Sequence, residues 1–193
     1  MDQAELFDFS AFPTLTTKRL VLRDLARSDA ADVFVFRGDY EVQKYNDDTL
    51  TSVDEVSAFI EAMRAGYAAQ QRIMWAITLR GANKVLGVCG MNYWDRKHQR
   101  AAIGYDMARA YWGQGLATEA VGAMLRFGFE RMQLNRVEAE AVVDNTRSVR
   151  LLERLGFQRE GIRREFTLED DGAYHGSAVY GLLRREYFNS TER

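Results

Sequence analysis

The spacing of apolar side chains alternates along the chain between two periods. Stretches in which every second residue is apolar are typical of half-buried strands, and apolar residues at every third or fourth position are typical of helices. The first pattern, or a short continuous apolar run, predicts strands at about 17–25, 73–79, 85–94, 101–108, 136–143, 158–168 and 174–184. The second predicts helices at about 28–38, 53–70, 115–132 and 146–155. We therefore expect an α/β protein with a sheet of about seven strands.

The order of these elements divides the sheet into two parts. The first strands follow one another through turns such as Gly81-Ala82-Asn83, so that part is expected to be antiparallel. From residue 101 the order becomes strand, helix, strand, helix. A strand–helix–strand unit over 101–143 predicts two parallel strands joined by a right-handed crossover. The sheet is thus expected to be mixed and mostly antiparallel, with a parallel core.

The size and composition of the chain exclude several classes of protein. Its 193 residues, with 47% apolar and 28% charged side chains, fit a single globular domain over 1–193. A net charge of −2 argues against a nucleic-acid binder. The longest stretches without a charged residue, 85–94 and 173–183, are too short to cross a bilayer, so no membrane partner is expected.

The cysteine and histidine content predicts a protein without a structural metal. Cys89 is the only cysteine, so no internal disulfide is expected. With only His98 and His175 besides, a Cys/His zinc cluster is excluded. The N-terminus is acidic and lacks the basic start of a signal peptide, which favours a cytoplasmic location.

Charge is unevenly distributed along the chain. Residues 1–70 carry 7 basic and 13 acidic side chains, whereas residues 71–193 carry 19 and 15. The window 145–164 holds six arginines against Glu153 and Glu160. This asymmetry is compatible with an anionic ligand in the second half, or simply with solvated faces of short elements.

A glycine-rich loop follows the predicted strand 101–108. Gly113-Gln114-Gly115 precedes a helix whose first N–H groups have no partner within the helix, so the loop and helix start can hold a phosphate. A dinucleotide fingerprint is disfavoured because Thr118 stands where its third glycine is required. A nucleotide P-loop is excluded because the chain contains no Gly-Lys-Ser/Thr. A loop without a ligand remains an alternative when the loop is considered alone.

Further motifs follow the glycine-rich loop in a fixed order along the chain. After the next strand come Asp144-Asn145-Thr146-Arg147-Ser148 and then the sequence LLERLGF at 151–157. This order of motifs resembles the acetyl-CoA-binding core of the GNAT superfamily of N-acetyltransferases. The opening TKRLVLRDL, the YWGQGLATEA block, and DGAYH followed by VYGLL are similar to the Rim-type branch, which includes ribosomal-protein N-terminal acetyltransferases. The resemblance covers about residues 14–187. The sequence departs from the family pattern at Trp112, where Gln or Arg is usual, and at Gly176, where many relatives have Asp.

The resemblance implies a GNAT fold and a binding mode for acetyl-CoA. The two parallel strands would splay apart, and the pantetheine arm would insert between them. Main-chain groups of Met107 and Ala108 would bind its amides and polarise the thioester carbonyl. The pyrophosphate would lie on the N–H groups of Gly113, Gln114, Gly115, Leu116, Ala117 and Thr118. Arg150 and Arg154, at i, i+4 spacing on one helix face, could then reach the phosphates.

Several residues near this core are candidates for the chemistry. Asn145 is expected either to cap the last helix or to contact the cofactor, and both can hold together. The resemblance implies that Ser148 is the general acid for the leaving thiolate, although capping alone would also explain it. Candidate bases for the amine are Asp106, by its position on the central strand, and Glu165, by resemblance. Glu165 is preferred. Glu160 is a third candidate base, with a structural ion pair to a nearby arginine as the alternative.

The predicted function is acetyl transfer from acetyl-CoA to an amine by direct transfer in a ternary complex. The first choice of acceptor is a protein N-terminal α-amino group. A small polar amine, such as an antibiotic or a polyamine, is the alternative acceptor. A non-catalytic acyl-CoA-binding protein on the same fold is the alternative from another class. Either a monomer or a homodimer is compatible with the sequence.

Overall fold

A computed structural model describes residues 7–46, 49–169 and 171–191. The strands are β1 (Leu15–Thr16), β2 (Leu20–Asp24), β3 (Ile73–Leu79), β4 (Val85–Asp95), β5 (Arg100–Met107), β6 (Arg136–Val142), β7 (Gln158–Leu168) and β8 (Tyr174–Leu183). The helices are α1 (Ala30–Arg37), α2 (Tyr40–Gln43), α3 (Val53–Ala68), α4 (Leu116–Glu130), α5 (Thr146–Arg154) and α6 (Arg184–Thr191). Short 3₁₀ turns occur at Arg27–Asp29 and Arg109–Tyr111.

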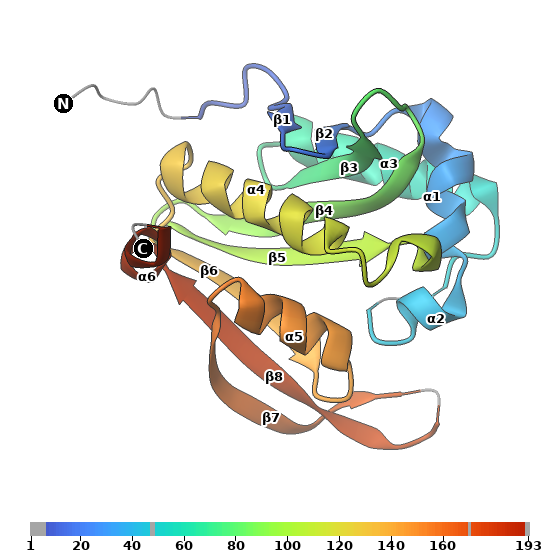
Figure 1. Ribbon diagram of the computed structural model, residues 1–193. Helices are drawn as coiled ribbons and strands as arrows, with labels where there is room; N and C mark the ends of the chain where they lie inside the picture. Colours follow the sequence, from blue (N-terminus) through green and yellow to red (C-terminus); the bar gives the residue numbers. More distant parts are fainter. Residues whose placement is uncertain (1–6, 47–48, 170, 192–193) are drawn as a thin grey trace.

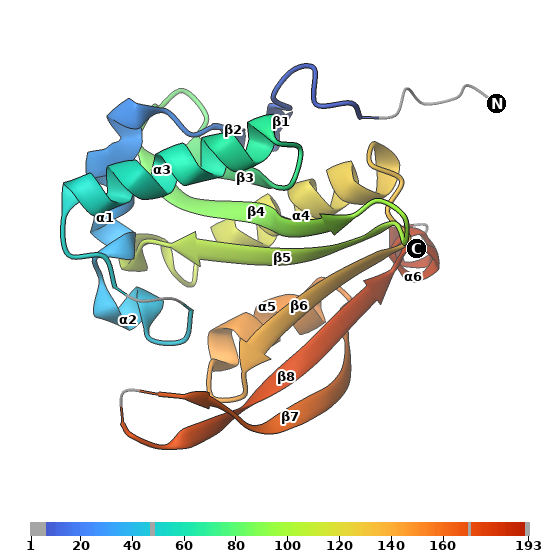
Figure 2. The same ribbon diagram turned by 180° about the vertical axis from the view of Figure 1, so that it is seen from behind.

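The strands form one eight-stranded sheet in the order β1-β2-β3-β4-β5-β6-β8-β7. All neighbouring pairs are antiparallel except β5 and β6, which are parallel. Figure 1 shows α4 and α5 on one face of the sheet, and Figure 2 shows α1 and α3 on the other. The predicted mixed α/β sheet with a parallel strand–helix–strand core is therefore confirmed.

Each face of the sheet carries its own apolar core. On the α4 face, Val121, Met124 and Leu125 are almost completely buried against the strands. On the other face, Val33, Phe36 and Ile60 of α1 and α3 form the second core. The periodicity of the helices thus corresponds to burial of one stripe of each helix.

The parallel pair β5–β6 is bonded only at its start. Arg100, Ala101 and Ala102 pair with Arg136, Val137 and Glu138, and no pairing between these strands is formed beyond that point in the described chain. The strands diverge from there toward α2, as Figures 1 and 2 show. This splay, which the resemblance implied, leaves unpaired edges that a ligand can occupy.

Some elements have no clear signal in the sequence. The two-residue β1 and the four-residue α2 are too short for a period to be recognised, and α6 was not predicted. The predicted helix 28–38 begins as a 3₁₀ turn because Asp29 accepts hydrogen bonds from Arg23 and from the Ala26 N–H. No helix in the described ranges has the length and apolar character needed to cross a membrane.

Candidate active site

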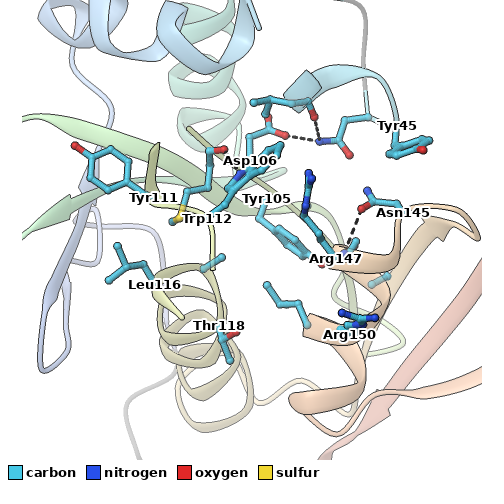
Figure 3. A pocket seen from close by; sticks show the side chains of 18 of the residues that line it. Tyr45, Tyr105, Asp106, Tyr111, Trp112, Leu116, Thr118, Asn145, Arg147 and Arg150 are labelled. Atoms are coloured by element: carbon cyan, nitrogen blue, oxygen red, sulfur yellow. Dashed lines mark hydrogen bonds between the residues drawn. The ribbon is translucent and has the colours of Figure 1, made fainter. Parts of the chain in front are cut away.

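A cavity of about 360 Å³ occupies the splay between β5 and β6. One wall is formed by β5 from Ile103 to Met107, and the opposite wall by β6 and α5. The loop and first turn of α4 close one end, and α2 and the residues after it close the other (Figure 3). The cavity therefore combines elements from both halves of the chain.

The glycine loop turns sharply at the start of α4. Gly113 and Gly115 both have φ of +73°, a conformation that L side chains rarely adopt. Gly115 is the N-cap of α4, so the first N–H groups of the helix are left for an external partner. Gly113, Gly115, Leu116, Ala117 and Thr118 all line the cavity.

The other residues of this loop hold its outer side in place. Gln114 does not line the cavity: its side chain donates to Ala110 O at 2.9 Å, and its carbonyl accepts from Arg19. Glu119 accepts hydrogen bonds from Arg19 and Thr17, which lie next to β2. These bonds anchor the start of α4 to the sheet, and they explain the acidic residue in its first turn.

Successive residues of β5 direct their main-chain groups to opposite edges of the strand. The N–H of Ala108 donates to Leu86 O at 2.8 Å, so it is already used by the neighbouring β4. Ala108 is also absent from the cavity wall. The structure therefore does not support Ala108 as a main-chain donor to a ligand. The groups of Met107 point to the splayed edge, where its carbonyl accepts from Trp112 Nε1 at 2.7 Å.

Three arginines of α5 face this cavity. Arg147, Arg150 and Arg154 are spaced i, i+3 and i+7, so they lie on one side of the helix, and all three line the cavity. The Arg147 guanidinium lies 3.9 Å from the centre of the Trp112 ring, a cation–π contact between α5 and the segment that precedes the glycine loop. Sequence reasoning selected the last two and missed Arg147, although it belongs to the same arginine-rich window.

Asn145 and Ser148 are held together at the start of α5. The Asn145 side chain accepts from the Ser148 N–H at 3.2 Å, so Asn145 caps the helix and also lines the cavity. The Ser148 hydroxyl lies 2.7 Å from the Tyr105 hydroxyl of β5. Burial raises the pKa of Tyr105 to about 12, so its hydroxyl keeps its proton at neutral pH.

Asp106 borders the cavity, but its carboxylate is turned toward α1 and α2. It forms an ion pair with Arg37 Nη1 at 2.8 Å. It also accepts from Asn46 Nδ2 at 2.5 Å, a bond drawn as a dashed line in Figure 3. Both ionic side chains are less than a tenth exposed. This network joins β5 to the α1–α2 region, and its oxygens are already occupied by fixed partners.

The structure does not bring Glu165 to the cavity. Glu165 is exposed on β7, with φ of +50°, where the register between β7 and β8 is interrupted. Glu160 forms an ion pair with Arg136, which lowers the pKa of its carboxyl, as expected for a structural partner. Its partner Arg136 is the first residue of β6, so it lies outside the arginine-rich window 145–164.

The far end of the cavity is lined by residues that the sequence did not identify. Glu41 belongs to α2, and Tyr45 lies just beyond it. Glu140 comes from β6, where its carboxylate pairs with Arg163 of β7 at 2.5 Å. These residues are separated by about a hundred positions in the chain, so no local pattern connects them.

Comparisons with known proteins agree with this architecture. A family model described as an acetyltransferase (GNAT) domain matches residues 19–158. The uncharacterized N-acetyltransferase p20 of Bacillus licheniformis is 37% identical over 175 residues, which cover 90% of this chain and 98% of that protein. The [ribosomal protein uS5]-alanine N-acetyltransferase of Escherichia coli (strain K12) is 35% identical over 68 residues, 35% of each chain.

Solved structures share the fold over almost the whole chain. A GNAT-family acetyltransferase from Bacillus anthracis has a TM-score of 0.80 at 24% identity, covering 90% of this chain and 100% of that one. RimL, a ribosomal L7/L12 alpha-N-protein acetyltransferase solved in complex with coenzyme A, has a TM-score of 0.81 at 22% identity, covering 89% and 98%. Because both structures are less than 25% identical to this chain, their similarity establishes its fold and nothing further.

Proposed function

The chain belongs to the GNAT acetyltransferase family and is an N-acetyltransferase, and from this premise we propose that it transfers the acetyl group of acetyl-CoA to a protein N-terminal α-amino group. Transfer is direct, with both substrates bound at once in the cavity between β5 and β6. The observation that carries the proposal is the arrangement of this cavity, with anion-binding groups at the α4 end and carboxylates at the α2 end.

The residues of the α4 end fit a long polyanion with an uncharged arm. Gly113 and Gly115 leave the loop backbone accessible, and the start of α4 supplies N–H groups to a pyrophosphate. Arg150 and Arg154 provide positive charge for the phosphates, and Arg147 extends the same stripe. The main chain of Met107, which lines the cavity, would bind the pantetheine arm through its N–H, because its carbonyl already accepts from Trp112, and the cap residue Asn145 lines the same cavity.

Acetyl-CoA supplies an activated thioester when it is bound, and the protein has to orient it and manage two protons. Ser148 is suited to donate to the leaving sulfur, because its residue lines the cavity and its hydroxyl is bonded to the Tyr105 hydroxyl, while Asn145 holds its backbone N–H. The acceptor ammonium has to lose a proton before attack. Asp106 is engaged by Arg37 and Asn46, and Glu165 lies outside the cavity wall. The proton therefore leaves through water, and catalysis depends mainly on positioning.

A cationic acceptor suits the opposite end of the cavity. Glu41 and Glu140 line this end, and the first 70 residues carry an excess of acidic side chains. Carboxylates at this end attract an ammonium group. The relationship to the uS5-alanine N-acetyltransferase and the Rim-type motifs favour a protein N-terminus over a small amine.

Thiol release from acetyl-CoA tests the proposal. The purified protein is given peptides with free N-termini copied from ribosomal proteins, the same peptides with blocked N-termini, aminoglycosides and polyamines. Release with free peptides, and none with the blocked ones, is the expected result. Preference for an aminoglycoside or a polyamine would replace the protein acceptor by a small amine. Binding of coenzyme A without turnover on any amine would overturn the proposal.

A further inference from the structure

Across the splay, a hydrogen bond between two hydroxyl groups joins the walls of the cavity. The Tyr105 hydroxyl of β5 lies 2.7 Å from the Ser148 hydroxyl of α5. Figure 3 shows the Tyr105 ring extending from the strand toward the start of the helix. The proposed function uses Ser148 but gives Tyr105 no task.

The direction of this bond determines what Ser148 can do. Each hydroxyl carries a single hydrogen, so only one of the two can donate to the other. A phenol is a stronger acid than an aliphatic alcohol, which favours Tyr105 as the donor. Since burial raises the pKa of Tyr105 to about 12, this donor stays protonated throughout the neutral range. The Ser148 N–H is meanwhile bonded to Asn145, which fixes the helix turn that carries the serine.

We propose that Tyr105 is a positioning residue that donates its hydrogen bond to Ser148 and thereby directs the Ser148 hydrogen toward the leaving sulfur. This inference rests on the proposed function, in which Ser148 assists departure of the thiol. Without Tyr105, the Ser148 hydrogen would be free to point toward any acceptor in the cavity. Tyr105 itself keeps its proton and touches neither substrate in this role.

The step balances without a further reactant. The amine nitrogen forms a bond to the acetyl carbon, and the bond from that carbon to sulfur breaks with its electron pair going to sulfur. Ser148 gives its hydroxyl proton to the sulfur, which leaves as a thiol. The proton released by the amine returns through water to the Ser148 oxygen. The Tyr105 hydrogen bond stabilises the charge that develops on that oxygen.

The decisive experiment is a double-mutant cycle on Tyr105→Phe and Ser148→Ala. Tyr105→Phe keeps the ring and its packing, and should lower kcat about tenfold, which corresponds to about 1.4 kcal/mol. The KM for acetyl-CoA, the KM for the acceptor and the affinity for coenzyme A should stay within about twofold. Ser148→Ala should lower kcat by about a hundredfold. Adding Tyr105→Phe to Ser148→Ala should cause no further loss.

A second tyrosine provides a matched control. The Tyr180 hydroxyl of β8 is buried and has no hydrogen-bond partner in the described part of the chain. Tyr180→Phe also removes one buried tyrosine hydroxyl, and it should leave kcat unchanged.

The outcomes separate this inference from the proposed function. An unchanged kcat in Tyr105→Phe, or an equal loss in the presence and absence of Ser148, would overturn the role of Tyr105 while acetyl transfer by the parent protein stands. A loss of coenzyme A affinity together with kcat would identify a structural role instead. If the parent protein released no thiol with any amine, the proposed function and this inference would both be wrong.

Discussion

The two ends of the cavity differ in the kind of group that lines them. The α4 end consists mainly of main chain, with two glycines at positive φ and the unpaired N–H groups of a helix start. The α2 end consists of side chains that come from α2, the residues after it and β6, and Glu140 of β6 is held by an ion pair with Arg163 of β7. A main-chain site depends on local geometry, whereas a side-chain site depends on contacts between distant segments.

This difference predicts that the two ends can be disrupted separately. A change at the α4 end should weaken coenzyme A and leave the affinity for the acceptor intact. A change at the α2 end should do the reverse, or should destabilise the junction between α1, α2 and β5. Four predictions, with five substitutions between them, test this separation, beginning with the largest expected effect.

Arg37→Ala should have the largest effect, because it removes the buried partner of Asp106. Breaking a buried ion pair leaves an uncompensated charge, and a loss of about 3 kcal/mol in the free energy of unfolding is expected. Urea denaturation measures this loss. Arg27→Ala is the control, because Arg27 forms an exposed ion pair with Glu61, and little change is expected. Equal stability of the two variants would show that the Asp106 network does not support the α2 end.

Gly115→Val should damage the α4 end while the sheet and its helices remain folded. A β-branched residue at φ of +73° is strained, so the loop should move and its N–H groups should lose their alignment. We expect coenzyme A affinity to fall at least about tenfold, or about 1.4 kcal/mol, by calorimetry. Gly161→Val is the matched control: Gly161 lies on exposed β7, where an added Cβ meets nothing within 4 Å. Unchanged affinity in folded Gly115→Val would place the phosphates elsewhere.

Arg150→Ala and Arg154→Ala should have smaller, ligand-dependent effects. If these side chains bind the 3′-phosphate, each variant should lose about threefold in affinity for coenzyme A and less for dephospho-coenzyme A. The losses should shrink as the salt concentration rises, because exposed charge pairs are screened. Arg159→Ala, which lies outside the cavity wall, should behave as the parent protein. Equal losses for both ligands would indicate contact with the diphosphate or a general charge effect.

Glu165→Gln should have the smallest effect, although the resemblance made Glu165 the preferred base. Because this side chain is exposed on β7 and outside the cavity wall, turnover should stay within about twofold of the parent value. A positioned base typically contributes about 10²- to 10⁴-fold. A loss of that size, partly rescued at high pH where the amine deprotonates itself, would restore Glu165 as the base and show that β7 approaches the acceptor.

The fold could be predicted wherever the pattern was long enough to show its period. The helices α3, α4 and α5 and the strands from β3 to β8 all appear within a few residues of their predicted bounds. The misses are short elements, such as β1 and α2, whose existence depends on neighbours rather than on their own sequence. The parallel pair β5–β6 followed from element order, because a single helix that crosses over between two neighbouring strands typically makes them parallel.

The candidate site likewise has a part that local sequence predicts and a part that depends on contacts between distant segments. The sequence alone predicted the glycine loop, the helix start after it, the Asn145 cap as one of two roles, and two of the three arginines on α5, because each is a local geometry encoded within a few residues. Only the tertiary structure decided that Ala108 donates to Leu86, that Asp106 is held by Arg37 and Asn46, and that Glu165 lies away from the cavity. It also placed Tyr105 against Ser148, 43 positions later in the chain. The physical reason is that a side chain's partners are set by which elements pack together, and pairs so far apart in the chain leave no periodic trace in one sequence.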